Sequence, residues 1–121
     1  MARILFIDDV PEIQKLYSEV LTKHGHKVVV AGSAMQALMS LQNGEYDYVF
    51  VDIKIPDFDG FYFLKQSKLE QEHPKTKVII LSNSESMKDY ERAKALGAEK
   101  YLVKIDYSPY GLAQMIKNGE L

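Results

Sequence analysis

The hydrophobic positions along the chain form short continuous runs that alternate with longer stretches of helical period. The runs are rich in β-branched and aromatic residues, which predicts strands near 3-8, 27-31, 47-52, 77-82 and 100-103. Between them apolar residues recur every three or four positions, which predicts helices near 11-24, 33-43, 60-72, 86-96 and 108-118. This regular alternation indicates an α/β domain with a doubly wound parallel sheet.

Residues that begin or end helices agree with these boundaries. Pro11 suits the first turn of the first helix and Gly25 its end, while Ser33 and Gln36 form a capping-box pattern. The strand at 77-82 is almost continuously hydrophobic, as expected when helices cover both faces of a sheet. The side chains expected in the core between the helix layers include Val49, Val51, Val78, Ile80 and Leu102.

Length and composition limit the classes of function. The 121 residues suit one domain, and we expect a single domain over 1-121 with no attached output domain. A formal net charge of -2 provides no basic field, so direct nucleic-acid binding is not expected. The absence of cysteine excludes disulfides, thiolate catalysis and cysteine-ligated zinc. No apolar stretch approaches the roughly 18 residues that span a bilayer, so we predict a cytoplasmic protein without membrane contact.

Acidic residues follow two of the predicted strands. Asp8 and Asp9 come directly after the first apolar run, and Asp52 comes directly after the third. If these strands are parallel neighbours, their carboxyl ends bring the carboxylates into one pocket, where open α/β sheets bind ligands. Clustered negative charges either raise a pKa or recruit a cation, and a hard divalent ion suits oxygen ligands.

Further polar residues follow the other strands at the same predicted edge. The loop after Asp52 contains Pro56 and the pair Asp59-Gly60, residue types that any βα turn uses. The fourth strand ends at Ser82, and Lys104 follows the fifth. Acids, a hydroxyl and a lysine at one end of four strands are hard to attribute to turn chemistry alone.

Taken together, these positions resemble the receiver domain of bacterial response regulators, the CheY-like family, along the whole chain. The resemblance implies a flavodoxin-like (βα)5 fold with strand order 2-1-3-4-5. It also implies a phosphoacceptor switch of two-component signal transduction, in which Asp52 accepts the phosphoryl group. Such a domain is a regulatory phosphoacceptor rather than an enzyme, with at most self-phosphorylation and self-dephosphorylation activity.

The resemblance assigns roles to individual residues. Asp9 and Asp52 would ligate Mg²⁺ (or Mn²⁺) directly, Asp8 through water, and Lys54 through its backbone carbonyl. The donor would be a phosphohistidine on a histidine kinase or histidine phosphotransfer protein. The Ser82 hydroxyl and the Lys104 ammonium would bind the oxygens of the aspartyl phosphate, and their movement would be the switch.

The family also suggests how the phosphoryl state is read. Ser82 would couple to Tyr101 on the fifth strand, although a half-buried tyrosine packing on the sheet is an ordinary alternative. The surface formed by 86-96, 100-103 and 108-118 would meet an unidentified downstream protein. Its interface candidates, some of which belong equally well to the core, are Met87, Tyr90, Tyr107, Tyr110 and Met115.

Two positions depart from the common family pattern. Ile105 stands where most receivers have a proline after the lysine, so we predict a trans peptide there and an altered reach of Lys104. Lys54 and Ser84 lie two positions beyond Asp52 and Ser82, where the family tunes phosphate hydrolysis. We hypothesise that the Lys54 side chain covers the site of the attacking water and lengthens the life of the phosphoryl state.

The three histidines are not expected to take part in the site. His24, His26 and His73 are predicted to be solvated residues near helix ends, away from the pocket.

A phosphorylation-independent interaction module of the same fold is the alternative function. Carboxylates after the first strand argue against a flavodoxin, which needs a phosphate cradle there. Lys54 argues against a haloacid dehalogenase-type phosphatase, which needs a second acid at that position.

Overall fold

The computed structural model describes residues 2–121, which contain a single five-stranded parallel sheet. The strand order is β2-β1-β3-β4-β5, so the predicted flavodoxin-like order 2-1-3-4-5 is confirmed. The pairing is parallel at every interface of the sheet. The strands are β1 (Arg3–Ile7), β2 (Lys27–Ala31), β3 (Tyr48–Val51), β4 (Lys77–Ser82) and β5 (Lys100–Val103).

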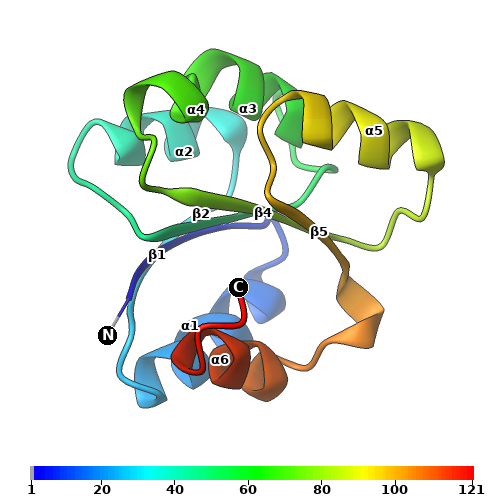
Figure 1. The fold of residues 1–121 in the computed structure, drawn as a ribbon. Coiled ribbons are helices and arrows are strands. Elements are labelled where there is room, and N and C mark those ends of the chain that lie inside the picture. Colours follow the sequence, from blue (N-terminus) through cyan, green and yellow to red (C-terminus); the bar gives the residue numbers. More distant parts are fainter. Residues whose placement is uncertain (1) are drawn as a thin grey trace.

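Helices cover both faces of the sheet (Figure 1). One face packs against α1 (Pro11–Lys23) and α6 (Pro109–Lys117). The other face packs against α2 (Ala34–Leu41), α3 (Gly60–Ser67), α4 (Leu69–Glu72) and α5 (Met87–Ala95). A 3₁₀ turn, η1 (Lys104–Asp106), follows β5. None of the helices in residues 2–121 has the length and apolar character needed to cross a membrane.

The core has one half on each face of the sheet, because successive strand residues point in opposite directions. In β1, Leu5 and Ile7 belong to the half under α2 and α3, whereas Ile4 and Phe6 belong to the half over α1 and α6. The five predicted core side chains are all buried: Val49, Val51, Val78, Ile80 and Leu102. The prediction of a sheet covered on both faces is therefore confirmed.

The predicted helix at 60-72 is wrong as one element. It is divided at Lys68, whose φ of 51° places it in the left-handed region. Leu64 and Leu69 are both buried in the same half of the core. In one continuous helix, side chains five positions apart point about 140° away from each other. The break at Lys68 lets both leucines face the sheet.

The capping pattern predicted at the second helix forms with one difference. The Ser33 Oγ accepts a hydrogen bond from the Gln36 N–H at 3.1 Å, as expected for an N-cap. The Gln36 Oε1, however, accepts from the N–H of Gly32 at 2.7 Å rather than from Ser33. The helix start is therefore held from both sides.

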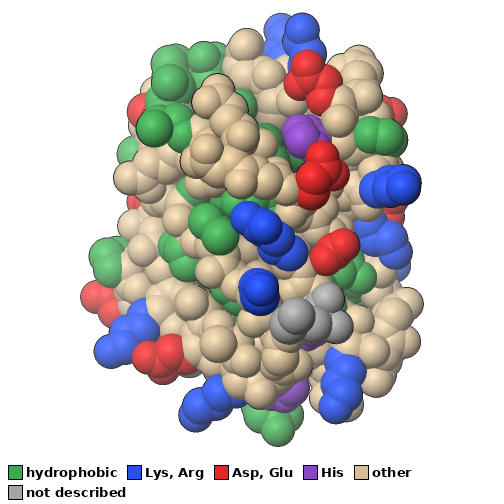
Figure 2. Space-filling model, turned by 90° about the vertical axis from the view of Figure 1, so that its left-hand side faces the viewer, with side chains coloured by type: hydrophobic (Ala, Val, Ile, Leu, Met, Phe, Trp, Pro, Cys, Tyr) green, Lys and Arg blue, Asp and Glu red, His purple; other side chains and the backbone are tan. Residues whose placement is uncertain are grey.

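The face where the strands begin carries lysine, arginine, acidic and histidine side chains mixed together (Figure 2). His26 is buried there, with 6% of its surface exposed, so its prediction as a solvated residue is wrong. Its Nδ1 accepts a hydrogen bond from the Ala2 N–H at 3.1 Å, which joins the ring to the residue before β1. His26 follows the turn after α1 directly and lines one pocket together with Ala2 and with Ile116 of α6.

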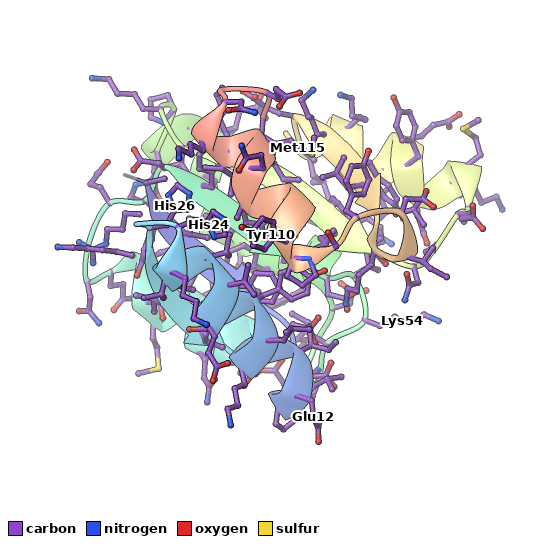
Figure 3. All side chains as sticks on the ribbon, turned by 90° about the horizontal axis from the view of Figure 1, so that it is seen from below. Glu12, His24, His26, Lys54, Tyr110 and Met115 are labelled. Atoms are coloured by element: carbon purple, nitrogen blue, oxygen red, sulfur yellow. The ribbon has the colours of Figure 1, made fainter. Side chains whose placement is uncertain are left out.

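The other two histidines are half-buried rather than fully solvated. The His24 ring packs edge-on against Tyr110 of α6, with ring centroids 4.6 Å apart (Figure 3). His73 lies 3.5 Å from an oxygen of Glu45. None of the three histidines lines the pocket that contains Asp52, in agreement with the prediction.

Candidate functional site

Two carboxylates meet at the carboxyl edge of the sheet because β1 and β3 are neighbours. Ile7 pairs with Val51, so the residues that follow them, Asp8 and Asp52, lie at the same level at the edge of the sheet. The Asp52 N–H donates to the Ile7 carbonyl at 3.1 Å and continues the ladder by one bond. The side chain of Asp8 is 1% exposed and that of Asp52 is 14% exposed. Both charges are therefore largely withdrawn from water.

The Lys104 ammonium neutralises this pair. Its Nζ lies 2.6 Å from Asp8 Oδ2 and 2.9 Å from Asp52 Oδ2, although Asp8 is 96 positions away in the chain. Burial alone would lower the pKa of Lys104, but the hydrogen bonds to Asp52 and Asp8 outweigh it and raise the pKa above its ordinary value. The amine therefore carries its positive charge, and the site holds a compact ion triplet.

Each carboxylate divides its oxygens in the same way. One oxygen binds Lys104, and the other accepts from the backbone N–H two residues further along the chain. Asp8 Oδ1 accepts from Val10 at 2.9 Å, and Asp52 Oδ1 accepts from Lys54 at 3.3 Å. Such bonds from an aspartate to the backbone two residues further on are Asx turns, and they fix the orientation of the carboxylate. The site consequently offers oxygen donors that converge on one cation.

The peptide after Lys104 is trans, as predicted, since residues 2–121 contain no cis peptide bond. Lys104 begins the 3₁₀ turn η1, and the Tyr107 N–H donates to its carbonyl at 3.2 Å. The turn allows the ammonium to reach both carboxylates without a proline at Ile105. An unusual residue at this position therefore does not prevent the lysine contact.

The third predicted acid lies apart from this triplet. Asp9 is exposed and makes no hydrogen bond or ion pair within residues 2–121. In the same range, no three aspartate, glutamate or histidine side chains form a cluster that could hold a metal ion. The donor chemistry nevertheless fits Mg²⁺, because Asp8 and Asp52 present oxygens to one shared cation and Asp9 adjoins them in sequence. The full ligand set remains a prediction.

A pocket of about 370 Å³ opens beside Asp52. It is lined by Asp52, Lys54, Ser82, Asn83 and Ser84. Ser82 is buried, and its Oγ accepts from the Ser84 N–H at 3.3 Å. The hydroxyl predicted to bind phosphoryl oxygens thus lies in the same pocket as the predicted acceptor.

Tyr101 contacts the loop that follows β4. Its hydroxyl donates to the Ser84 carbonyl at 2.9 Å, and the Ser84 Oγ donates to Asp89 at 2.6 Å. Burial raises the pKa of Tyr101, so the phenol stays protonated and remains a donor. The predicted switch tyrosine is therefore linked to the pocket through the residue two positions after Ser82.

The loop between β3 and α3 contains two constraints that its sequence only partly reveals. Gly60 is required, because a Cβ there would lie 2.5 Å from the Asp52 carbonyl. Asp57 has a φ of 68° and accepts hydrogen bonds from the N–H groups of Ala34 and Met35, both at 3.2 Å. Asp57 thus caps α2 from a distant loop, a role that our sequence reasoning missed because it depends on a tertiary contact.

Known proteins resemble this chain over nearly its whole length. A family model described as the response regulator receiver domain matches residues 4–117. A gliding motility regulatory protein of Myxococcus xanthus is 33% identical over 94% of this chain, which spans only 15% of that larger protein. Sporulation initiation phosphotransferase F of Bacillus subtilis is 33% identical, with 84% of this chain and 81% of the relative covered.

Solved structures agree with the family match. The Vibrio cholerae chemotaxis protein CheY4 superposes with a TM-score of 0.86 at 28% identity, covering 98% of both chains. Response regulator TrrA of Thermotoga maritima, solved in complex with Mg²⁺-BeF, gives a TM-score of 0.80 at 28% identity over 98% of both chains. The chain belongs to the response regulator receiver domain family. Receiver domains act in two-component signalling as regulatory domains rather than as classical enzymes.

Proposed function

We propose that this chain is a phosphoacceptor switch in which Asp52 receives a phosphoryl group from a phosphohistidine. The observation that carries the proposal is the Lys104 ammonium, held between the carboxylates of Asp8 and Asp52 beside a pocket that contains Ser82. A carboxylate attacks an anionic phosphoryl group only when charge is neutralised and the groups are aligned. Lys104 supplies one such charge.

Mg²⁺ would supply the rest of the neutralisation. Receiver domains bind Mg²⁺ in general, and the TrrA neighbour was solved with it. We assign the direct carboxylate ligands to Asp9 and Asp52, a water-mediated contact to Asp8, and one oxygen to the Lys54 carbonyl. Mn²⁺ has the same preference for oxygen ligands. When bound, the ion neutralises the charge of the incoming phosphoryl group.

The transfer itself exchanges one bond to phosphorus for another. A carboxylate oxygen of Asp52 forms a bond to phosphorus as the bond from phosphorus to the donor imidazole breaks, and the imidazole leaves with that electron pair. The Lys104 ammonium lies 2.9 Å from Asp52, so a short displacement brings it to the new phosphoryl oxygens. The Ser82 hydroxyl lines the same pocket and donates to another oxygen. A histidine kinase or histidine phosphotransfer protein is the expected donor.

The readout surface would lie on α5, β5 and α6. Tyr101 links this surface to the pocket through Ser84. Of the predicted interface residues, Tyr107 and Met115 are half-buried and pack against the core. The exposed residues that remain available to a partner are Met87, Tyr90 and Tyr110. A downstream protein would therefore meet mainly the α5 side of this surface.

The alternative is a phosphorylation-independent interaction module with the same fold. Treatment with acetyl phosphate or phosphoramidate, with and without Mg²⁺, separates the two functions by intact mass. We expect the mass of one phosphoryl group to be added only with the metal and only when Asp52 is present, so Asp52→Asn abolishes the gain. Asp106→Asn, an exposed acid on the same edge, is the matched control and should be modified normally. An unchanged wild-type mass would favour the interaction module.

Lys54 would set the lifetime of the phosphoryl state. Its side chain is exposed and extends outward at the edge of the pocket (Figure 3). We expect Lys54→Ala to lose phosphate about two- to tenfold faster, because water gains access to phosphorus. This factor corresponds to a decrease in the activation free energy of hydrolysis of about the energy of one contact. Lys54→Arg keeps a long cationic side chain and should resemble the wild type. A decay rate that is unchanged in Lys54→Ala would refute the shielding role.

A further inference from the structure

A side-chain hydrogen bond joins the two loops that frame the pocket. The N–H of Ile105 donates to Asn83 Oδ1 at 3.1 Å, across 22 positions of sequence. Asn83 belongs to the loop between β4 and α5, and Ile105 belongs to the turn η1 after β5. Within residues 2–121 it is the one side-chain hydrogen bond between residues 83-86 and residues 104-106. We call this contact the Asn83–Ile105 clasp.

The clasp lies between the groups that must move on phosphorylation. Ser82 pairs with Val103 at the end of the sheet, so Asn83 and Lys104 are the next residues on each side. Ser82 lines the pocket beside Asp52, and Lys104 binds Asp52 directly. The clasp therefore joins the β4–α5 loop directly to the turn that carries the lysine.

Side-chain packing of Ile105 contributes little to holding the turn η1 in place. The Ile105 side chain is 84% exposed, so it contributes little burial that would hold η1 in place. The backbone N–H is the group of Ile105 that makes a contact, and a proline at this position would have no N–H to donate. The contact thus requires the asparagine oxygen at position 83 and any residue other than proline at position 105.

We propose that Asn83 is a positioning residue that couples the Ser82 loop to Lys104 through the N–H of Ile105. The inference rests on the proposed phosphoacceptor function and adds a regulatory element to the same site. In the absence of the clasp, η1 samples positions from which the ammonium reaches the phosphoryl group less often. The rate of phosphoryl transfer to Asp52 falls accordingly, while the fold is retained.

A double-mutant cycle tests the coupling. The variants are Asn83→Ala, Ile105→Pro and the double variant, with Ile105→Ala as the control that keeps the N–H and removes the exposed side chain. The measurements are the initial rate of modification by acetyl phosphate with Mg²⁺, and the hydrogen exchange of the residue 105 amide in wild type, Asn83→Ala and Ile105→Ala. Thermal unfolding of every variant establishes that the protein is folded under the conditions of the rate measurement.

Each single clasp variant should lower the rate by about two- to tenfold, the factor that corresponds to one hydrogen bond. The double variant should be no slower than either single variant, because both substitutions remove the same contact. Ile105→Ala should keep the wild-type rate, and the amide of residue 105 should exchange faster in Asn83→Ala only.

Multiplicative losses in the double variant, or unchanged exchange in Asn83→Ala, would overturn the inference. Multiplicative losses would mean that Ile105→Pro acts by restricting the backbone of Lys104 rather than by removing a donor. A wild-type protein that gains no phosphoryl group would instead disprove the proposed function. The two failures are therefore distinguishable.

Discussion

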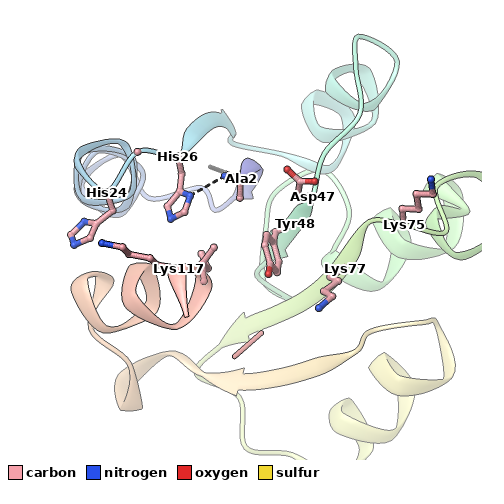
Figure 4. A pocket seen from close by; sticks show the side chains of 10 residues that line it. Ala2, His24, His26, Asp47, Tyr48, Lys75, Lys77 and Lys117 are labelled. Atoms are coloured by element: carbon pink, nitrogen blue, oxygen red, sulfur yellow. Dashed lines mark hydrogen bonds between the residues drawn. The ribbon is translucent and has the colours of Figure 1, made fainter. Parts of the chain in front are cut away.

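At the amino edge of the sheet three polar side chains bind the backbone of distant segments, whereas at the carboxyl edge one ammonium, that of Lys104, binds two carboxylate side chains. The amino edge surrounds a pocket of about 510 Å³ (Figure 4). There Asp47 accepts from the Arg3 N–H at 2.8 Å, and Lys77 donates to the Leu121 main-chain oxygen at 2.8 Å. His26 likewise accepts from the backbone N–H of Ala2, the residue before β1. These contacts join segments that are distant in sequence and hold the termini of the strands.

The carboxyl edge differs because its side chains can change partners. Lys104 is shared between Asp8 and Asp52; the carboxylates could instead bind a metal ion, and the ammonium could instead bind a phosphoryl oxygen. A side chain bound to the backbone of a neighbouring segment, by contrast, is not placed to exchange that partner for a metal ion or a phosphoryl group. The comparison indicates that one fold keeps a fixed edge and an exchangeable edge at opposite ends of the same strands.

The largest expected effect comes from removing a lysine at each edge. Lys104→Met leaves the Asp8 carboxylate buried without a counter-charge, which we expect to cost about 3 kcal/mol of unfolding free energy. Lys77→Met removes a hydrogen bond to a main-chain oxygen and should cost about 1 kcal/mol. Denaturant unfolding at neutral pH without divalent ions measures both values. Equal losses would contradict the distinction between the edges.

The same pair of variants tests cation exchange. If a divalent ion can neutralise the carboxylates, added Mg²⁺ should restore part of the stability of Lys104→Met, because binding to the native state shifts the unfolding equilibrium. Lys77→Met should gain no more from Mg²⁺ than the wild type does. A lack of recovery in Lys104→Met would argue against metal binding at this edge.

A smaller effect is expected at Asp57, where the carboxyl edge also uses a backbone contact. Asp57→Ala removes the acceptor for the N–H groups of Ala34 and Met35, and we expect a loss of about 1 kcal/mol, as for other helix caps. Asp57→Asn tolerates the positive φ but keeps only one of the two accepting oxygens, so it should recover about half of the loss. Denaturant unfolding measures both values, and a wild-type stability in Asp57→Ala would show that the cap is unimportant.

The smallest effect concerns pH and the amino edge. Burial lowers the pKa of His26, so the folded protein holds the neutral ring while the unfolded chain protonates it near pH 6.5. The stability contributed by the neutral ring is therefore fully present above about pH 6.5 and declines as pH falls toward the depressed folded pKa.

His26→Asn provides the comparison, since its amide can still accept from the Ala2 N–H but does not titrate. Unfolding free energies measured between about pH 5 and pH 8 should fall less steeply with decreasing pH in the variant than in the wild type. Parallel curves would show that His26 contributes nothing to the pH dependence.

Local patterns in the sequence predicted most of the fold. The strands and most of the helices follow from residue periodicity, whereas the 3₁₀ turn η1 was not predicted, and the break near Lys68 arises where burial of Leu64 and Leu69 outweighs helical continuity. The positions of Asp8, Asp52, Ser82 and Lys104 at one edge follow from their places after successive parallel strands. The family assignment depends on that local order.

Tertiary structure alone decided which of these residues touch. Lys104 binding both Asp8 and Asp52, Asn83 holding Ile105, and the burial of His26 all join segments that lie 22 or more positions apart. No local periodicity encodes such partners, because they are selected by how the strands pair and how the loops close. The sequence by itself determined the elements and their order, and packing determined the charges that neutralise one another.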